Sequence, residues 1–274
     1  MTAHLPEIRE AEAPPDIARI YADIKGATGL PQVNLIFRHL ATHPGMLDWV
    51  WQTLRPLYLS QELADAAAGL SRSVPPTDTS PLPDHLAPAD RDACRGVLAV
   101  YNSGNAQNLI GLTAFVHVLD GVAAGTGHPL TARRIAPCEP GTAAGFPPIP
   151  RRQDLPVEIT TLLARLGGRH RAVSGVIPSL YVHLSLWPEL LPVVDEFLAP
   201  RLSQPAWPTQ VQAIIDRASM TARDLAASLA PAPPPRIAGE PRGEMADTIR
   251  TFVNATIPEM VVVGRWLAWT RRTM

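Results

Sequence analysis

The amino-acid sequence predicts an all-α protein made of two helical repeats. Strand signals are scarce, because aromatic residues make up only 5% of the 274 residues and few segments alternate apolar and polar side chains. Helical spacing dominates, as where Ile17, Ile20 and Ile24 share one face of a first helix. Six positions also recur at a constant offset of 144. The pairs are Leu40/Leu184, Pro44/Pro188, Leu47/Leu191, Val50/Val194, Leu54/Leu198 and Pro56/Pro200. An offset of about half the chain indicates two copies of one unit, with a site expected between them.

The same periodicity predicts the elements of the first half. After the first helix, the expected helices cover residues 33–41, 46–57, 61–70, 90–101 and 106–124. A break is expected at residues 102–105, which read Asn-Ser-Gly-Asn, and residues 75–88 form a loop rich in Pro, Ser, Thr and Asp. Residues 125–152 contain repeated Pro and Gly without periodicity, which is typical of a linker.

The second half repeats this order. Its expected helices cover residues 157–166, 175–186, 188–202, 208–229, 244–254 and 258–271, with a Pro-rich loop at 231–242. Tyr101 and Phe252 correspond at an offset of 151, so the second copy contains about seven extra residues by that point. The sequence therefore predicts a first repeat at 1–124, a linker at 125–152 and a second repeat at 153–274.

Composition narrows the classes of partner. With 24 basic and 25 acidic residues the formal net charge is −1, which gives no electrostatic case for nucleic acid or an anionic membrane. The longest uncharged apolar stretch, 106–119, is too short to span a bilayer and is expected to be a buried helix. The segment from Met1 to Pro15 lacks the apolar core of a signal peptide, and Cys94 and Cys138 are expected as free thiols in a reducing compartment. We therefore expect a cytoplasmic protein.

Three short segments resemble the group I 2-haloacid dehalogenases. They are residues 21–25 with 30–33, 40–47 and Trp51; residues 97–105 with Thr113 and Ala114; and residues 187–188 with 195–200. The resemblance implies an all-α fold of two helical repeats with the site between them. It also implies a mechanism without cofactor, in which an aspartate deprotonates a water that attacks the halogen-bearing carbon directly.

The aspartate that this resemblance implies is missing. It should lie seven residues before Trp187, where the sequence has Leu180, and the serine that precedes it in the family is retained as Ser179. No Asp or Glu occurs between Ile159 and Pro188, so a shift in alignment cannot supply the base. Loss of a general base costs about 10²–10⁴-fold in rate.

Other positions that the resemblance assigns to the substrate pocket have also changed. Gln32 stands where the family has a tryptophan, Leu35 where it has another aromatic residue, and Asn108 where it has a tyrosine. Asn105 is retained, although a helix cap would explain it equally well. The pocket has therefore lost aromatic surface and gained amides, which suggests a different ligand.

Two side chains are candidates for a relocated general base. Glu259, which matches Asn108 at the offset of 151, is the first; its alternative is a first-turn glutamate favoured by the helix dipole. His183 is the second, and its alternative is a buried, hydrogen-bonded histidine. His39 and His43 are four residues apart, but Pro44 breaks the helix there and no third ligand is near, so we expect no metal site.

Three functional hypotheses follow. The first is a divergent dehalogenase homologue that binds a small organic acid or related polar molecule and acts as a hydrolase or lyase with a relocated base. The second is a non-catalytic small-molecule binding or interaction protein on the same fold. The third is a genuine 2-haloacid dehalogenase that uses unfamiliar residues. None requires a cofactor, nucleic acid or membrane, and a homodimer stays open.

Overall fold

The protein is all-α, as the sequence predicts. The computed structural model describes residues 5–77, 86–122, 125–135, 146–170, 176–235 and 241–268. The helices of the first half are α1 (Pro15–Thr28), α2 (Leu35–Leu40), α3 (Met46–Tyr58), α4 (Gln61–Ser73) and α5 (Pro88–Leu119). Those of the second half are α7 (Val157–Gly167), α8 (Ser179–Leu184), α9 (Leu190–Leu202), α10 (Trp207–Ala226), α11 (Pro241–Thr251) and α12 (Ile257–Leu267). Short 3₁₀ turns, Glu10–Glu12 and Arg152–Asp154, precede α1 and α7, and within the described ranges there is no strand.

Two helices of the first half have counterparts of equal length in the second half. Helices α2 and α8 each contain 6 residues, and α3 and α9 each contain 13. Both second-half helices begin at the offset of 144 from their counterparts, at 179 against 35 and at 190 against 46. This correspondence supports the expected duplication, while the boundaries at 124 and 152 stay a prediction.

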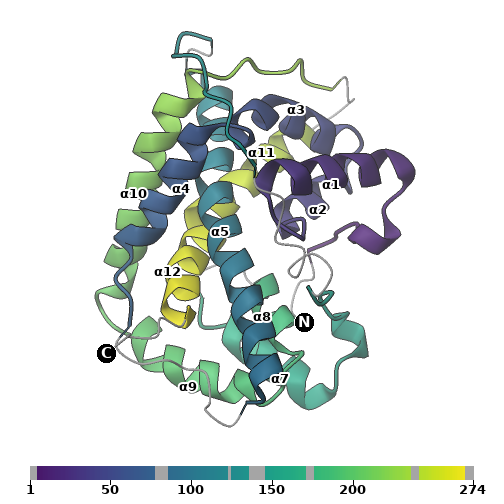
Figure 1. Ribbon diagram of the computed structural model, residues 1–274, viewed down its shortest axis with the longest axis vertical. Helices are drawn as coiled ribbons and strands as arrows, with labels where there is room; N and C mark the ends of the chain where they lie inside the picture. Colours follow the sequence, from purple (N-terminus) through teal and green to yellow (C-terminus); the bar gives the residue numbers. More distant parts are fainter. Residues whose placement is uncertain are drawn as a thin grey trace.

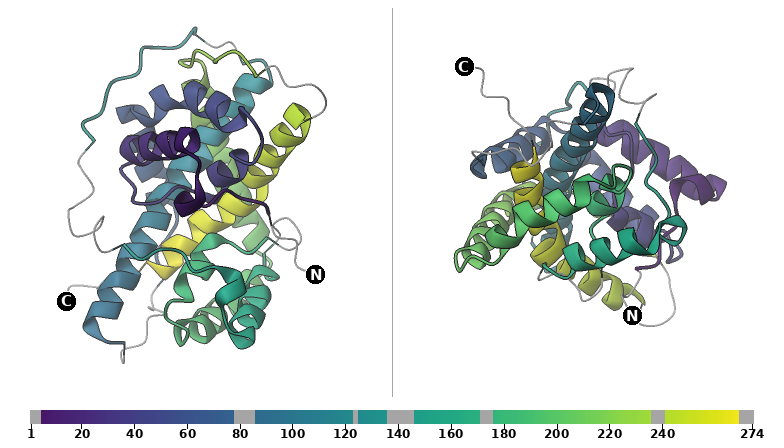
Figure 2. Two further views of the ribbon diagram at one scale, coloured as in Figure 1. Left: turned by 90° about the vertical axis from the view of Figure 1, so that its right-hand side faces the viewer. Right: turned by 90° about the horizontal axis from the view of Figure 1, so that it is seen from below.

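Helix α5 forms the centre of the molecule. It extends along the long axis in Figure 1, with α1–α3 near one end and α7–α9 near the other. Helices α4, α10 and α12 pack along it, and the two views of Figure 2 show α12 crossing beside it. Because α5 is covered on several sides, nearly every residue from Gly104 to Val116 is buried.

The predicted helix break at residues 102–105 is wrong, since α5 continues through this run without interruption. Asn, Ser and Gly favour turns, but burial of Gly104 and Asn105 outweighs that propensity, and the exposed Ser103 stays helical with them. Gly104 allows the close packing, because a Cβ at this position would lie 3.0 Å from Leu30 Cδ1. The alternative of Asn105 as a helix cap is therefore also wrong: the residue lies in mid-helix, and its side chain faces the protein interior.

The second expected break, between residues 254 and 258, is likewise absent. A π-helical segment, Phe252–Thr256, joins α11 to α12 in one helical run. Pro258 has no N–H that could donate to the carbonyl oxygen four residues earlier. A π-helical turn before it lets the helix continue without that hydrogen bond. Glu259 consequently lies inside a helical run rather than at a free N-terminus, which removes the helix-dipole explanation for it.

Cys94 is a buried free thiol, and burial raises its pKa to about 12. Cys138 lies outside the described residues. None of the helices in the described ranges is long and apolar enough to cross a membrane.

Gly111 gives a test of the packing around α5. A Cβ at this position would lie 2.8 Å from the hydroxyl oxygen of Tyr58, a fully buried residue that is itself hydrogen-bonded. We expect Gly111→Ala to lower the free energy of unfolding by about 1–3 kcal/mol, because the buried ring has to shift. Gly96→Ala in the same helix meets no atom within 4 Å, and we expect it to be stabilising by about 0.5–1 kcal/mol. Denaturant unfolding of both variants measures the difference; equal effects would contradict the packing described.

Candidate functional site

Three neighbouring cavities lie among α2, α5, α8 and the N-terminal segment. The first, here named the amide cavity, has a volume of about 10 Å³ and is lined by Gln32, Asn105 and Asn108, among others. The second, the arginine cavity, has about 50 Å³ and is lined by Leu35 and Ser179 together with three arginines. The middle cavity, of about 240 Å³, shares Gln32 with the amide cavity and two arginines with the arginine cavity. Five of the six predicted substrate-binding residues therefore line this group of cavities.

The amide cavity contains buried polar atoms without a hydrogen-bond partner in the protein. These atoms are Gln32 Oε1, Tyr101 OH and Asn105 Nδ2. Burial raises the pKa of Tyr101 well above its usual value, while the charge of Arg38 opposes that rise. A buried donor or acceptor without a partner costs free energy, so such atoms are normally satisfied by ordered water or a ligand. About 10 Å³ is the room that one water requires.

Asn108 lines the same cavity. Its Oδ1 accepts a hydrogen bond of 2.7 Å from the hydroxyl of Tyr58, and both side chains are buried. The amide at position 108 thus has a structural partner of its own within the first half, and its oxygen is occupied.

The arginine cavity is rich in positive charge. Arg9, Arg38 and Arg152 line it with one acidic residue, Glu7. The buried Arg38 forms an ion pair with Glu7 at 2.5 Å and donates from Nη1 to the carbonyl oxygen of Val33. Apart from these charged residues, the described residues that line the arginine cavity are mainly apolar. The apolar residues are Leu5, Leu35, Ile149, Pro150, Val176, Ile177 and Val182.

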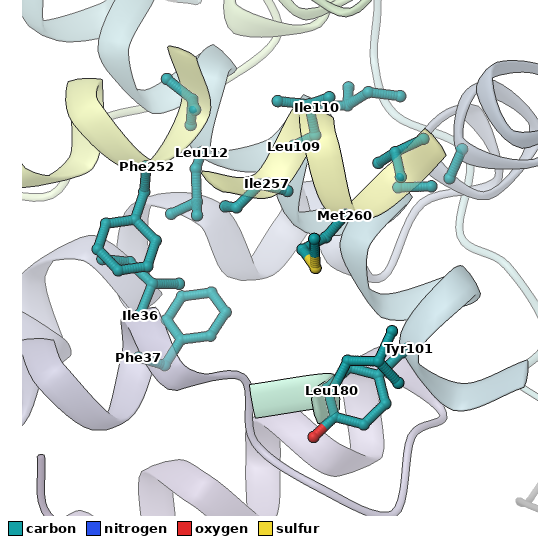
Figure 3. Packing of buried hydrophobic residues seen from close by; sticks show 14 of the residues in the cluster. Ile36, Phe37, Tyr101, Leu109, Ile110, Leu112, Leu180, Phe252, Ile257 and Met260 are labelled. Carbon is teal, nitrogen blue, oxygen red and sulfur yellow. The ribbon is translucent and has the colours of Figure 1, made fainter. Parts of the chain in front are cut away.

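Leu180 belongs to the core and is not among the residues that line the three cavities. It is 1% exposed in α8, next to Ser179, which lines the arginine cavity. Helix α8 contacts α5, and Figure 3 shows Leu180 in the same part of the core as Tyr101 of α5. The position where the resemblance implies a carboxylate is therefore occupied by a buried hydrocarbon that packs between the two halves.

Glu259 is engaged in a buried chain of hydrogen bonds. Its Oε2 lies 2.6 Å from Nδ1 of His170, whose Nε2 lies 2.7 Å from the hydroxyl oxygen of Tyr181. The side chains of His170 and Glu259 are 0% and 1% exposed. Burial raises the pKa of Tyr181 well above its usual value, and the negative charges of Glu259 and Asp195 add to this rise. Tyr181 therefore keeps its proton, and the Glu259 carboxyl group, the His170 ring and the Tyr181 hydroxyl form one continuous buried chain.

His183, the other candidate base, is also buried and is bonded through one ring nitrogen, while its Nδ1 has no hydrogen-bond partner. Its Nε2 lies 2.9 Å from the carbonyl oxygen of Pro147, so Nε2 carries a proton and donates it. The ring packs edge-on against Tyr101 and Phe146, with centroids 5.8 and 5.0 Å away. Neither His183 nor Glu259 is among the residues that line the three cavities.

The burial of His183 predicts an acid-sensitive stability. Burial, and to a smaller extent the charge of Arg38, lowers the pKa of His183 from 6.5 to about 4. The unfolded chain therefore binds the proton first, and the contribution present above pH 6.5 is lost as the pH falls toward 4. The whole effect amounts to about 3 kcal/mol. We expect His183→Gln, whose amide can still donate to Pro147, to reduce the loss of unfolding free energy between pH 6.5 and 4. Identical pH profiles for the two proteins would show that His183 is not the group responsible.

Comparison with known proteins identifies the fold. No family model matches the chain, and no curated protein matches it by sequence. Solved structures of D-2-haloacid dehalogenase do match over nearly the whole chain. A mutant superposes with a TM-score of 0.81 at 19% identity, covering 97% of this chain and 95% of its own. A complex with L-LA gives 0.82 at 18% identity, covering 97% and 96%. A mutant complex with D-2-CPA gives 0.78 at 18% identity, covering 97% of both chains.

This chain has the 2-haloacid dehalogenase fold. The match confirms the fold that the resemblance implied. Because the sequence identity is low, the chemistry of the site has to be argued from its own residues.

Several residues that matter in this dehalogenase fold were not predicted from the sequence. Arg9, Arg38 and Arg152 come from three separate segments, and no spacing along the chain relates them. His170 lies two residues after Gly168, the C-cap of α7, where the pattern indicates only the end of a helix. In the sequence Tyr101 stands out through the resembling segment and through its correspondence with Phe252, but its unsatisfied hydroxyl becomes evident only in three dimensions.

Proposed function

We propose that this protein binds a small organic acid in the group of cavities beside α8 and does not displace halide with a general base. The observation that carries the proposal is Leu180, a buried aliphatic side chain at the position where the mechanism requires a carboxylate. A hydrocarbon cannot accept a proton from water, so the base that this mechanism needs is absent at position 180.

The carboxylates that line the three cavities are already engaged. Glu7 pairs with Arg38 at 2.5 Å. Glu10 pairs with Lys25 at 2.8 Å and accepts a hydrogen bond from the backbone N–H of Val33, also at 2.8 Å. Oxygens that already accept from a cation or a backbone N–H are not free to take a proton from a water in the cavity. Neither acid is therefore a good substitute for the missing aspartate.

The hypothesis of a relocated base has less support. Glu259 faces His170 and Tyr181, and His183 donates to a backbone carbonyl, while neither lines the cavities. A general base has to reach the water that it deprotonates within hydrogen-bond distance or through one further water. Binding without catalysis accounts for this arrangement more simply.

The chemistry of the lining favours an acid as the ligand. Amide groups and an unsatisfied phenol hydroxyl lie at one end, and three guanidinium groups lie at the other. The structures with the same fold are described with the ligands L-LA and D-2-CPA. Small 2-substituted carboxylic acids are therefore the first ligands to test.

Isothermal titration calorimetry of the purified protein tests the proposal. Each enantiomer of 2-chloropropionate would be titrated at constant ionic strength, with 2-chloropropionamide as a neutral control of nearly the same shape. We expect saturable binding of at least one acid and at least about tenfold weaker binding of the amide, because charge-assisted hydrogen bonds are the stronger kind. Absence of acid binding, or equal binding of acid and amide, would contradict the proposal.

A further inference from the structure

We propose that the arginine cavity is the carboxylate-binding subsite of this protein and that Arg152 is its recognition residue. This inference rests on the proposed function and assigns the acid group of the ligand to one end of the cavities. The resemblance to the dehalogenases points to α2, α5 and α8, whereas Arg152 belongs to the 3₁₀ turn before α7.

The charges around the arginine cavity do not cancel. Arg38 is neutralised by Glu7, the acidic residue that lines this cavity. Arg9 donates from Nη2 to the carbonyl oxygen of Ile149 at 2.5 Å, a contact with a neutral group. Within the described residues neither Arg9 nor Arg152 forms an ion pair. Three guanidinium groups against one carboxylate leave an excess of two positive charges, which favours an anionic ligand.

Arg152 is the least satisfied of the three arginines. Its Nε is buried and has no hydrogen-bond partner, although its neighbour Arg151 is paired with Glu12. A guanidinium group presents its N–H donors in a planar fork, and a carboxylate matches that fork with two parallel hydrogen bonds. A ligand carboxylate would therefore satisfy a buried donor that the protein itself leaves open.

The size and walls of the cavity restrict the rest of the ligand. At about 50 Å³ the arginine cavity holds roughly four water-sized groups, which corresponds to a carboxylate with a short substituent. Its walls are apolar, with Leu35, Ile177 and Val182 among them, so an alkyl or halogen substituent is favoured over a second charged group. A depression of about 440 Å³ shares Glu7, Arg9 and Arg152 with the cavity and includes the exposed Arg151, which gives the ligand a route from solvent.

Binding of 2-chloropropionate to Arg152→Gln tests the assignment. We expect the dissociation constant, measured by calorimetry, to rise about 10- to 100-fold, because hydrogen bonds to a charged group are lost. Arg152→Lys retains the charge without the fork, and we expect a smaller loss of about fivefold or more. The matched control is Arg217→Gln, which makes the same charge change at an exposed position of α10 outside these cavities, and its affinity should equal that of the parent.

The possible results separate this inference from the proposed function. Failure of the parent to bind the acid would overturn both. Binding by the parent with an unchanged dissociation constant in the folded Arg152→Gln and Arg152→Lys variants would overturn the arginine assignment alone. If Arg152→Gln does not fold, Arg152→Lys decides the question. An affinity of Arg152→Lys equal to that of the parent would contradict recognition of the ligand carboxylate by the planar guanidinium group. Equal weakening in Arg217→Gln would show a long-range charge effect and would likewise contradict the assignment.

Discussion

Leu180→Asp should release chloride from 2-chloropropionate at least about 100-fold faster than the parent protein, because the substitution restores the general base at the position that the resemblance implies. An aspartate there would be largely buried, and burial raises the pKa of a carboxyl group toward the range in which it accepts a proton well. The water-sized amide cavity, with Asn105 Nδ2 and Tyr101 OH unsatisfied, offers donors and acceptors that can orient the attacking water. Halide release at pH 7–9, measured for each enantiomer, gives the result.

Leu180→Asn is the matched control, since it has the same size and polarity without an ionisable group. We expect it to stay at the level of the parent, which separates base catalysis from a mere change in packing. The thermal midpoint of both variants has to be measured as well, because a polar group in this core costs a few kcal/mol. Two folded variants that both bind the acid but release no halide would show that the cavities no longer hold the substrate carbon near position 180.

His170→Ala should lower the free energy of unfolding by about 3–5 kcal/mol, the largest stability effect expected in this protein. The imidazole bridges Glu259 of α12 and Tyr181 of α8 at 2.6 and 2.7 Å, and its side chain is fully buried. Removing it takes a hydrogen-bond partner from a buried carboxylate and from a buried hydroxyl at once, and it also leaves a cavity. Denaturant unfolding at pH 7 measures the loss.

An exposed ion pair provides the comparison for this result. Arg250 pairs with Asp120 at 2.6 Å, with side chains 38% and 50% exposed. Arg250→Ala should cost at most about 1 kcal/mol, because solvent screens such pairs. If His170→Ala cost no more than Arg250→Ala, the buried chain would contribute little, and Glu259 would be available for another role.

The fold class could be predicted because it depends on patterns along the chain. Helical spacing and the constant offset between the two halves indicated the right helix order, and α2 and α8 begin at that offset. The two predicted breaks were wrong because their cause lies outside the local sequence. Burial of Gly104, Asn105 and the residues after them keeps α5 helical, and a π-helical segment accommodates Pro258.

Residues of the candidate site could be predicted only within the segments that resemble the dehalogenases. Gln32, Asn105 and Ser179 indeed line cavities, and these positions come from short resembling segments. Arg9 and Arg152 belong to opposite halves of the chain, in segments without a recognisable motif. Only the packing of the N-terminal segment against residues 146–152 brings them together. The partner of Glu259 could not be predicted either, since nothing near His170 in the sequence indicates a contact with α12.

Halide release by the unmodified protein tests the central claim most directly. Purified protein would be incubated with racemic 2-chloropropionate at a concentration that calorimetry shows to be saturating, and chloride would be followed against a protein-free sample. The absence of a free carboxylate at position 180 predicts bound acid without chloride above the uncatalysed level. Chloride release at an enzymatic rate would contradict the claim, and its loss in Glu259→Gln would then identify the relocated base.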